Sequence, residues 1–251
     1  MRLRQIALVG EDLAAAEADI RAVLGLNYAY DDPGVGKFGL KNAVFPVGET
    51  FLEVVSPRQA GTTAGRLLEK RGGDGGYMVI LQVEDIAEAR ARIAEAGARV
   101  VEQADLDGGT VAMSHVHPKD VGGAILSLDF MSPWERWQWG GPVWRENART
   151  DTSTAIVGAE LQGDDPAAMA GRWGEVLGIK AEPADGGWRI PLEGGELRFV
   201  AAADGRGEGL GRFDVAVRDP AAVRASAKAR GLLTDAGDVM LSGTRVQPVQ
   251  A

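Results

Sequence analysis

The sequence has no cysteine, only two histidines, and few aromatic residues, which make up 6% of its 251 residues. The absence of cysteine excludes disulfide bonds, thiolate metal sites and cysteine nucleophiles, and it is typical of a protein in a reducing compartment. No apolar run is long enough to span a membrane, and the N-terminal run meets Glu11 and Asp12 before it reaches the length of a signal peptide. We therefore expect a cytoplasmic protein with no membrane partner.

Positive charge is also scarce, because 27 Lys and Arg stand against 36 Asp and Glu, for a formal net charge of -9. A nucleic-acid-binding surface neutralises many phosphates, so we expect no nucleic acid partner. The chain is 45% hydrophobic and 25% charged, which is typical of a globular protein and excludes a disordered one. Its length favours two domains, and its 35 glycines indicate many turns between short elements.

A strand-then-helix pattern occurs twice in the first half of the chain. Residues 5–20 and 78–93 each consist of a short apolar run, an acidic pair, and apolar residues at helical spacing. Asp12 and Asp85 stand where an N-cap carboxylate accepts the first amides of a helix. The pattern therefore predicts two equivalent modules, each opening with a strand and a helix.

The same pattern recurs in the second half, at residues 154–178 and 212–231, with Asp165 and Asp219 as the expected N-caps. Short strand-like runs separated by glycine follow each helix, at residues 43–47 and 50–55; 98–103, 110–116 and 124–130; 188–192 and 196–201; and 239–241 and 244–249. The sequence therefore predicts an α+β fold of four βαβββ modules, paired into two domains at residues 1–132 and 154–251.

The segment between these domains, residues 133–153, follows neither the helix nor the strand period. It holds four of the six tryptophans, namely Trp134, Trp137, Trp139 and Trp144. An exposed aromatic patch usually finds a protein surface to pack against. We therefore expect a tryptophan-rich linker whose side chains pack on the protein rather than line a ligand pocket.

Tandem βαβββ modules are the mark of the vicinal oxygen chelate superfamily, which includes glyoxalase I, methylmalonyl-CoA epimerase, extradiol dioxygenases and bleomycin-resistance proteins. The chain resembles this group, and over residues 37–130 its motifs resemble methylmalonyl-CoA epimerase. The motifs are FPVGETFLEVVSP at 45–57, GGYM at 75–78 and HPKDVGGAILSL at 117–128. The resemblance implies glyoxalase-like domains, each a half-open barrel built from two modules around a divalent metal that stabilises an enolate-like intermediate.

In that superfamily the first and last strands of each module supply the metal ligands. The resemblance places these positions at Gln5 and Glu53 in the first module and at Met78 and Ser127 in the second. A thioether and a neutral hydroxyl are poor ligands for Mg, Mn or Co, so the usual ligand set is incomplete and we assign no metal ligand. A divalent metal could bind only at a rebuilt site, for which Glu53 with His115 is the first pair to test. The two-histidine, one-carboxylate iron site of an extradiol dioxygenase is not formed.

Glu53 lies in the apolar run FLEVV, where strand alternation turns it to the face opposite Leu52 and Val54. In this architecture that face is the barrel interior. The functional interpretation is a ligand or a general base whose pKa is raised by desolvation. The structural interpretation is a glutamate paired to an arginine or hydrogen-bonded to Gln5 or Tyr77. We favour a functional role, because the neighbouring strands offer no basic residue in the same layer.

The two histidines, His115 and His117, fall on one side of the run VAMSHVHP. An imidazole can take or give a proton near neutral pH, so His115 joins Glu53 as a candidate catalytic residue. His117 belongs to the HPKDVGG turn, where a backbone role is the alternative to substrate binding. Lys119 in that turn could pair with a carboxylate or phosphate, or be a solvated loop lysine. The substrate-binding candidates are Gln5, Tyr77, Met78, Ser127, His117 and Lys119.

Three hypotheses remain open at the level of sequence. The first is a glyoxalase- or epimerase-type lyase or isomerase that acts on a small oxygenated metabolite in the first-domain cleft, with Glu53 as base or ligand. The second is a metal-free protein that binds and sequesters a small molecule, as bleomycin-resistance proteins do. In the third, the degenerate second half covers the first domain or builds a homodimer. The sequence does not identify the ligand, because one fold of this kind hosts many chemistries.

Overall fold

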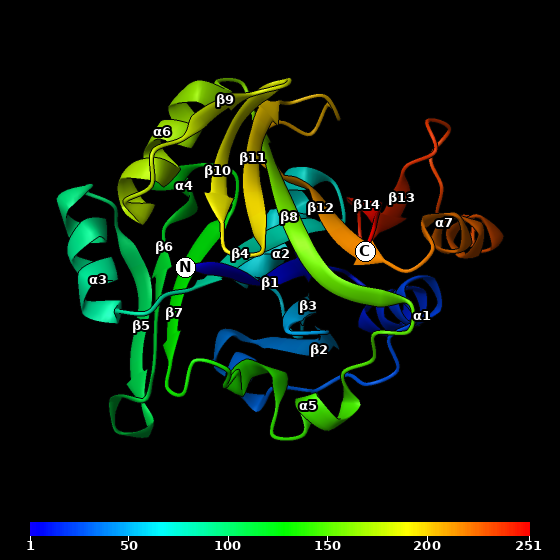
Figure 1. Ribbon diagram of the computed structural model, residues 1–251, viewed down its shortest axis with the longest axis horizontal. Helices are drawn as coiled ribbons and strands as arrows, with labels where there is room; N and C mark the ends of the chain where they lie inside the picture. Colours follow the sequence, from blue (N-terminus) through cyan, green and yellow to red (C-terminus); the bar gives the residue numbers. More distant parts are fainter. The chain divides into compact units, whose positions relative to one another are not determined.

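Residues 1–251 are described by a computed structural model, whose helices and strands are shown in Figure 1. The strands are β1 (Arg2–Val9), β2 (Leu40–Val47), β3 (Thr50–Pro57), β4 (Gly75–Gln82), β5 (Val100–Leu106), β6 (Val111–Val116), β7 (Ile125–Met131), β8 (Ser153–Gly163), β9 (Glu182–Ala184), β10 (Gly187–Leu192), β11 (Gly195–Ala201), β12 (Gly209–Val217), β13 (Val239–Leu241) and β14 (Thr244–Gln250). The α-helices are α1 (Leu13–Leu24), α2 (Thr63–Arg71), α3 (Ile86–Glu95), α4 (Pro118–Val121), α5 (Trp144–Asn147), α6 (Pro166–Leu177) and α7 (Pro220–Ala229). Short 3-10 helices are η1 (Pro33–Phe38), η2 (Asp107–Gly109) and η3 (Gln138–Gly140). None of the helices has the length and apolar character that crossing a membrane requires.

The four strand-then-helix units predicted from the sequence are present, and each helix begins where its aspartate caps it. The side chains of Asp12, Asp85, Asp165 and Asp219 accept backbone N–H groups of the first turns of α1, α3, α6 and α7, at 2.9–3.1 Å. Each such cap stabilises a helix by about 1 kcal/mol. In every module the first strand runs parallel to the last, as a helical crossover requires.

The modules differ in strand number. The runs expected after the first, second and fourth helices agree in number with the strands observed, whereas the third module has one strand, β9, beyond the two runs expected from its sequence. The second and third modules have three strands after the helix, whereas the first and fourth have two. In those two, the place of the extra strand is reduced to a single bridge, Tyr30 with Val44 and Leu233 with Val239. In the first module the chain turns at Pro33 into η1 instead of extending the bridge. The α+β fold of paired modules is confirmed, with two modules shorter than expected.

The strands belong to two seven-stranded sheets, one formed by the first and second modules and one by the third and fourth. The chain divides into two compact units that are discontinuous in sequence. Unit 1 is Met1–Arg4, Met78–Gln138 and Gly158–Gly211, and unit 2 is Gln5–Tyr77, Trp139–Val157 and Arg212–Ala251. The boundaries 1–132 and 154–251 stay a prediction.

Unit 1 contains the strand orders β4-β7-β6-β5 and β8-β11-β10-β9. Helices α3 and α6 pack against each other and lie side by side in Figure 1. The largest side chain of this packing is Trp173 of α6, which is fully buried, lies 5.9 Å from the ring of Phe199 and donates its Nε1 hydrogen to the carbonyl of Gly122 at 3.0 Å. The indole therefore fills the core of unit 1 without leaving its polar atom unpaired.

Unit 2 contains the strand orders β2-β3-β1 and β13-β14-β12, and helices α1 and α7 pack together (Figure 1). The apolar stripe of α1 predicted from its spacing is buried, at Leu13, Ala16, Ile20 and Val23. An ion pair of 2.6 Å between Arg230 and Asp19 accompanies this helix contact. The burial of these apolar faces is the main stabilising contribution in unit 2.

The tryptophans of the linker pack against protein side chains. Trp137 and Trp144 are 1% and 5% exposed, and the ring of Trp144 meets Phe51 edge-on at 5.0 Å within unit 2. In unit 1 the guanidinium of Arg2 lies 4.6 Å from the centre of the Trp134 ring, at a cation–π distance. The structural role expected for these aromatic side chains agrees with these contacts.

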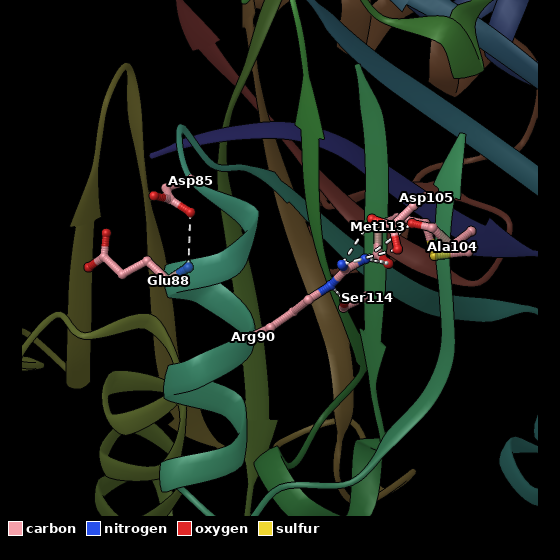
Figure 2. A network of polar contacts seen from close by, with 7 residues as sticks. All are labelled: Asp85, Glu88, Arg90, Ala104, Asp105, Met113 and Ser114. Carbon is pink, nitrogen blue, oxygen red and sulfur yellow. Dashed lines mark hydrogen bonds and ion pairs between the residues drawn. The ribbon is translucent and has the colours of Figure 1, made fainter. Parts of the chain in front are cut away.

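One arginine joins a helix of unit 1 to two strands, as Figure 2 shows. Arg90 of α3 donates from Nε to the buried hydroxyl of Ser114 at 3.0 Å and from a terminal nitrogen to Asp105 at 2.9 Å. Its other terminal nitrogen reaches the carbonyls of Ala104 and Met113 at 3.2 and 3.3 Å. The guanidinium therefore fixes α3 to β5 and to β6, the strand that carries His115.

We predict that Arg90→Met destabilises the protein by about 3 kcal/mol, because charge-assisted bonds are lost and partly buried acceptors are left without a donor. The free energy of unfolding in urea measures this loss. As a matched control, Arg189→Met removes the ion pairs of a solvent-exposed arginine with Glu182 and Glu196 and should cost less than about 1 kcal/mol. Equal losses in the two variants would show that the Arg90 contacts have no special weight.

Candidate functional site

The candidate site in unit 2 is centred on Glu53, in the middle of β3. Glu53 lies beside Ala7 of the parallel strand β1 and Val44 of the antiparallel strand β2. Its side chain is only 6% exposed, which agrees with the interior face expected from strand alternation. The sequence therefore places an ionisable group among apolar strands, where a charge is costly unless hydrogen bonds stabilise it.

Two side-chain amides hold the carboxylate of Glu53, one on each oxygen. Asn42 Nδ2 donates to Oε1 at 2.6 Å, and Gln5 Nε2 donates to Oε2 at 2.8 Å. Asn42 is itself fixed, because its Oδ1 accepts the backbone N–H of Asp32 at 2.9 Å. We name this group, made of Gln5, Asp32, Asn42 and Glu53, the Glu53 cluster. Its three buried members come from three adjacent strands, and Asp32 comes from the turn that precedes η1.

The surroundings of Glu53 raise its pKa to about 7, from an ordinary value of 4.5. Burial is the main cause, because it removes water from the charged form. The hydrogen bonds from Asn42 and then Gln5 oppose this rise, and the negative charge of Asp32 adds to it. The hydrogen-bond partners of this carboxylate are neutral amides, and the group can therefore gain or lose a proton near neutral pH.

Tyr77, at the start of β4, adds a phenol to the surroundings of Glu53. It is 8% exposed, and its pKa is raised to about 12 by burial and by the charge of Glu53, against a smaller opposing effect of Arg66. The phenol therefore keeps its proton at neutral pH and is available as a hydrogen-bond donor. Arg66 uses its guanidinium locally, on the Gly61 carbonyl and the Thr63 hydroxyl.

Two other predicted substrate-binding residues lie in unit 1, on the paired strands β4 and β7. Met78 is 8% exposed and lies opposite Ile125, and Ser127 is fully buried. The hydroxyl of Ser127 donates a hydrogen bond to the carboxylate of Asp129, which is 2% exposed. The resemblance assigns a metal ligand to the position of Ser127. In this chain the Ser127 hydroxyl is instead hydrogen-bonded to Asp129.

The two histidines occupy different environments. His115 is half-buried on β6, directly opposite Ser127 in the strand pairing. His117 stands at the N-terminus of α4, where its Nδ1 accepts the backbone N–H of Lys119 at 3.0 Å. His117 therefore has the backbone role considered for it, while substrate binding by its remaining nitrogen stays a prediction. Lys119 is exposed.

The rest of the HPKDVGG turn is explained by contacts within unit 1. Asp120 accepts the backbone N–H and two side-chain nitrogens of Arg99 at 2.7–2.8 Å, and this contact holds the pKa of its carboxyl well below the usual range. Gly123, with a φ of 80°, donates its N–H to Glu208 and lies so close to Leu161 that a side chain would not fit. Much of this motif therefore serves the packing of the turn.

Sequence reasoning missed Asn42 and Asp32 in unit 2 and Asp129 in unit 1. Asn42 interrupts the apolar strand LKNAVFPV, and Asp129 interrupts ILSLDFM. The argument that selected Glu53, a polar residue inside an apolar strand, applies to both. Asp32 was harder to identify as a site residue, because an aspartate before proline is common at the start of a helix. Its side chain does cap η1, by accepting the N–H of Gly34.

The divalent metal implied by the fold is not matched by the residues present. Both oxygens of Glu53 already accept amide hydrogens, and Gln5 turns its nitrogen, not its oxygen, toward the carboxylate. The other two positions that the resemblance assigns to metal ligands hold the thioether of Met78 and the hydroxyl of Ser127, which are poor ligands for a hard cation. No three His, Cys, Asp or Glu side chains are grouped so that they could hold a metal ion.

We predict that Glu53 makes the protein less stable as the pH rises from 4.5 to 7. Between these values the unfolded chain has lost the proton of Glu53 and the folded chain still binds it, so deprotonation favours unfolding. Relative to Glu53→Gln, the parent should lose about 3 kcal/mol over this range and no more above it. The difference between their urea unfolding free energies at pH 4 to 8 measures the effect. A difference that does not change with pH would contradict a raised pKa.

Comparison with known proteins agrees with the architecture. A family model described as a glyoxalase-like domain matches residues 6–177. The chain is 32% identical over 132 residues to the ethylmalonyl-CoA/methylmalonyl-CoA epimerase of Cereibacter sphaeroides, and the match covers 51% of this chain and 96% of the epimerase. It is 26% identical over 129 residues to the mitochondrial methylmalonyl-CoA epimerase of Bos taurus, covering 51% of this chain and 73% of that protein.

A solved structure resembles nearly the whole chain. It is a mutant of 4-hydroxymandelate synthase from Streptomyces coelicolor, with a TM-score of 0.68 and 16% sequence identity, covering 92% of this chain and 75% of that one. At this identity the likeness concerns the fold alone, and it extends over both halves of the chain. Together with the match to the family model, it shows that the chain belongs to the glyoxalase-like family of the vicinal oxygen chelate superfamily.

Proposed function

We propose that this chain catalyses proton transfer at a carbon next to a carbonyl group of a small oxygenated metabolite, as an epimerase or isomerase does, with Glu53 as the base. The observation that carries the proposal is the state of Glu53, a buried carboxylate with a pKa of about 7, held by two amides. A general base is most effective when its pKa lies near the working pH, because it is then both deprotonated and strong enough to take the proton.

In the proposed reaction the C–H bond breaks and the proton moves to a carboxylate oxygen of Glu53. The electron pair of that bond moves toward the carbonyl, which becomes an enolate oxygen. Return of a proton to the carbon restores the carbonyl, so no electron is lost or gained and no redox partner is needed. Tyr77 is suited to donate a hydrogen bond to the enolate oxygen, because its raised pKa keeps the phenol protonated.

The names of the relatives support a substrate class for this proposal. Ethylmalonyl-CoA and methylmalonyl-CoA each have a carbon between a thioester and a carboxylate, and two carbonyl groups make its proton acidic. We propose a carbon acid of this kind as the substrate. Among the residues predicted to bind it, Lys119 is the cation suited to a carboxylate, while substrate contacts of Gln5, Met78, Ser127 and His117 stay predictions.

An epimerase needs a second acid–base group, because the proton leaves one face of the carbon and returns to the other. His115 is the candidate that the sequence offers for this group, and its role in this step stays a prediction. It is half-buried on β6, and an imidazole exchanges protons near neutral pH. Its strand is held to α3 by the contacts of Arg90 to the neighbouring Ser114 and Met113.

We expect the parent to exchange the acidic hydrogen of a 2-alkylmalonyl thioester for deuterium in D2O and to racemise that carbon. The exchange rate should rise with pH through about 7 and then level off, because Glu53 must be deprotonated to act. Glu53→Gln should slow exchange and racemisation at least about 100-fold. His115→Gln should slow racemisation far more than exchange. Proton NMR and optical rotation measure the two rates.

Ser56→Ala is the matched control, because Ser56 lies on the same strand, fully buried, and donates its hydroxyl to the carbonyl of Gly10 rather than to Glu53. It should retain both rates. Full exchange activity in Glu53→Gln, measured in protein that melts like the parent, would end the proposal. Equal slowing of exchange and racemisation in His115→Gln would remove the role proposed for His115.

A metal-free binding protein is the second candidate function. The observation that favours it is the donor set, since Met78 and Ser127 replace ligands and both oxygens of Glu53 are occupied by amides. A binding protein of this type would bind thioesters or aromatic metabolites in calorimetry without exchanging their hydrogens. In that case Glu53→Gln should change the affinity for the ligand, and neither the parent nor the variant should exchange the hydrogens of the ligand. The homodimer and the cytoplasmic location expected from the sequence stay predictions, and light scattering tests the former.

A further inference from the structure

Strand β5 is an uncovered edge of the first sheet, on the outer side of β6 in unit 1 (Figure 1). Most of its residues are exposed, because helix α3 packs on the neighbouring strands β6 and β7. Val100, Val101 and Leu106 are 40%, 48% and 39% exposed, and they are three of the five large apolar side chains that the chain leaves exposed. A free strand edge with apolar side chains is a surface on which another strand can pair.

The other three sheet edges are protected. Strand β2 is buried along most of its length and is bridged by Tyr30 and by Arg149. Strand β9 has three residues, and Pro183 at its centre has no N–H to donate to a further strand. Strand β13 also has three residues and is bridged by Leu233. By contrast, β5 has seven residues and contains neither lysine nor proline, the residues that commonly prevent pairing at an edge.

The backbone of β5 presents hydrogen-bonding groups to the free edge at Gln103. Arg90 Nη2 reaches the carbonyl oxygens of Ala104 on β5 and Met113 on β6, at 3.2 and 3.3 Å, as Figure 2 shows. One nitrogen can contact both oxygens only if the Ala104 carbonyl points toward β6. Because carbonyl directions alternate along a strand, the N–H and C=O of the preceding residue, Gln103, point away from β6. An antiparallel partner strand could therefore exchange two backbone hydrogen bonds with Gln103.

The apolar residues of β5 match each other when two copies of the strand run antiparallel about a two-fold axis at Gln103. In this register Val100 lies opposite Leu106 of the second copy, and the symmetry makes the contact twice. Side chains that are exposed in one copy would then bury each other. A bulge interrupts the pairing of β5 with β6 between Val100 and Glu102, whereas residues 102–106 are in regular register. The axis therefore lies in the regular part of the strand.

The charges of β5 and its ends favour the same register. The exposed side chains of Arg99 and Asp107 lie opposite each other, so opposite charges meet at both ends of the strand pair. Glu102 lies opposite Ala104, and no carboxylate faces another. A shift of one residue would place Glu102 opposite Asp105, and like charges at directly opposite positions destabilise a strand pair. The charge pattern therefore fits a second copy of the same strand.

We propose that β5 is an interface at which two copies of this chain pair, forming one continuous sheet across a two-fold axis. A second copy fits this edge because the same residues supply both sides of every contact. A single strand pair is a small interface, so we expect a dimer that dissociates on dilution. The pairing is independent of the role proposed for Glu53, which lies in unit 2, so either proposal can fail without the other.

The first test is the molar mass of the full chain as a function of its concentration, measured by light scattering and by sedimentation. The parent should change from monomer to dimer as the concentration rises. Leu106→Lys places a charge opposite an apolar side chain and should raise the dissociation constant at least about tenfold. Val143→Lys is the matched control, because Val143 is exposed to a similar extent, 38% against 39%, and lies outside β5. This control should dimerise like the parent.

Two variants of the residue at the axis test the register. Gln103→Pro removes an N–H that points away from β6, so it should melt like the parent and be monomeric. Gln103→Cys introduces a thiol into a chain that has no cysteine. It should form an intermolecular disulfide under mild oxidation, because Cα atoms about 5.5 Å apart can be bridged. In Leu106→Cys the two thiols would lie about 20 Å apart, so this control should not form the disulfide.

A parent that stays monomeric up to about 1 mM would overturn the proposal. A dimer that Leu106→Lys and Gln103→Pro both leave intact would also overturn it, because such a dimer uses another surface. Equal disulfide formation in Gln103→Cys and Leu106→Cys would show that the strands do not pair in the proposed register. Dimerisation that is lost in Leu106→Lys and kept in Val143→Lys, with a disulfide in Gln103→Cys alone, is the result that supports the interface.

Discussion

The removal of water from one carboxylate is the constraint on which the candidate site depends. Burial of Glu53 between strands raises its pKa, and only hydrogen bonds from Asn42 and Gln5 limit the rise. Neutral amides suit this balance, because an arginine in contact would lower the pKa of a carboxylate by one to three units, roughly, and make it a weak base. An apolar surrounding without donors would raise it further and keep the group protonated. With two amides as its donors, Glu53 has a pKa of about 7, which lies between these extremes.

The shortened first module is part of the same arrangement. Where the second and third modules extend a further strand, the first makes a single bridge at Tyr30 and then turns into η1. A continuing strand would direct its backbone N–H groups into a ladder with its neighbour. In the turn, the N–H of Asp32 meets the side chain of Asn42 instead. The loss of regular structure thus supplies the donor that orients Asn42, and through it Glu53.

The scaffold could be predicted from the sequence because it is set by local signals repeated four times. The aspartate caps, the apolar stripe of α1 and the alternation around Glu53 are each visible within about ten residues. The partners of Glu53 could not be found in this way, since Asn42 is joined to it by the register of β2 on β3, and Asp32 by a turn. The single bridges that replace strands in two modules depend on tertiary pairing. The HPKDVGG motif indicated a turn, but its contacts to Arg99 and Glu208 come from segments remote in sequence.

The incomplete set of metal ligands and the raised pKa of Glu53 are physically connected. A carboxylate bound to a divalent cation has its pKa driven far down, since the cation favours the charged form. Such a group holds the metal and cannot also take a proton near pH 7. In this chain the same strand position, Glu53, meets amide hydrogens and has a pKa of about 7. Met78 and Ser127 occupy two of the positions that the resemblance assigns to metal ligands, and both are poor ligands for a hard cation. Glu53 is therefore not required as a metal ligand. The position then becomes available for proton transfer, which connects the unusual donor set to the function proposed for the site.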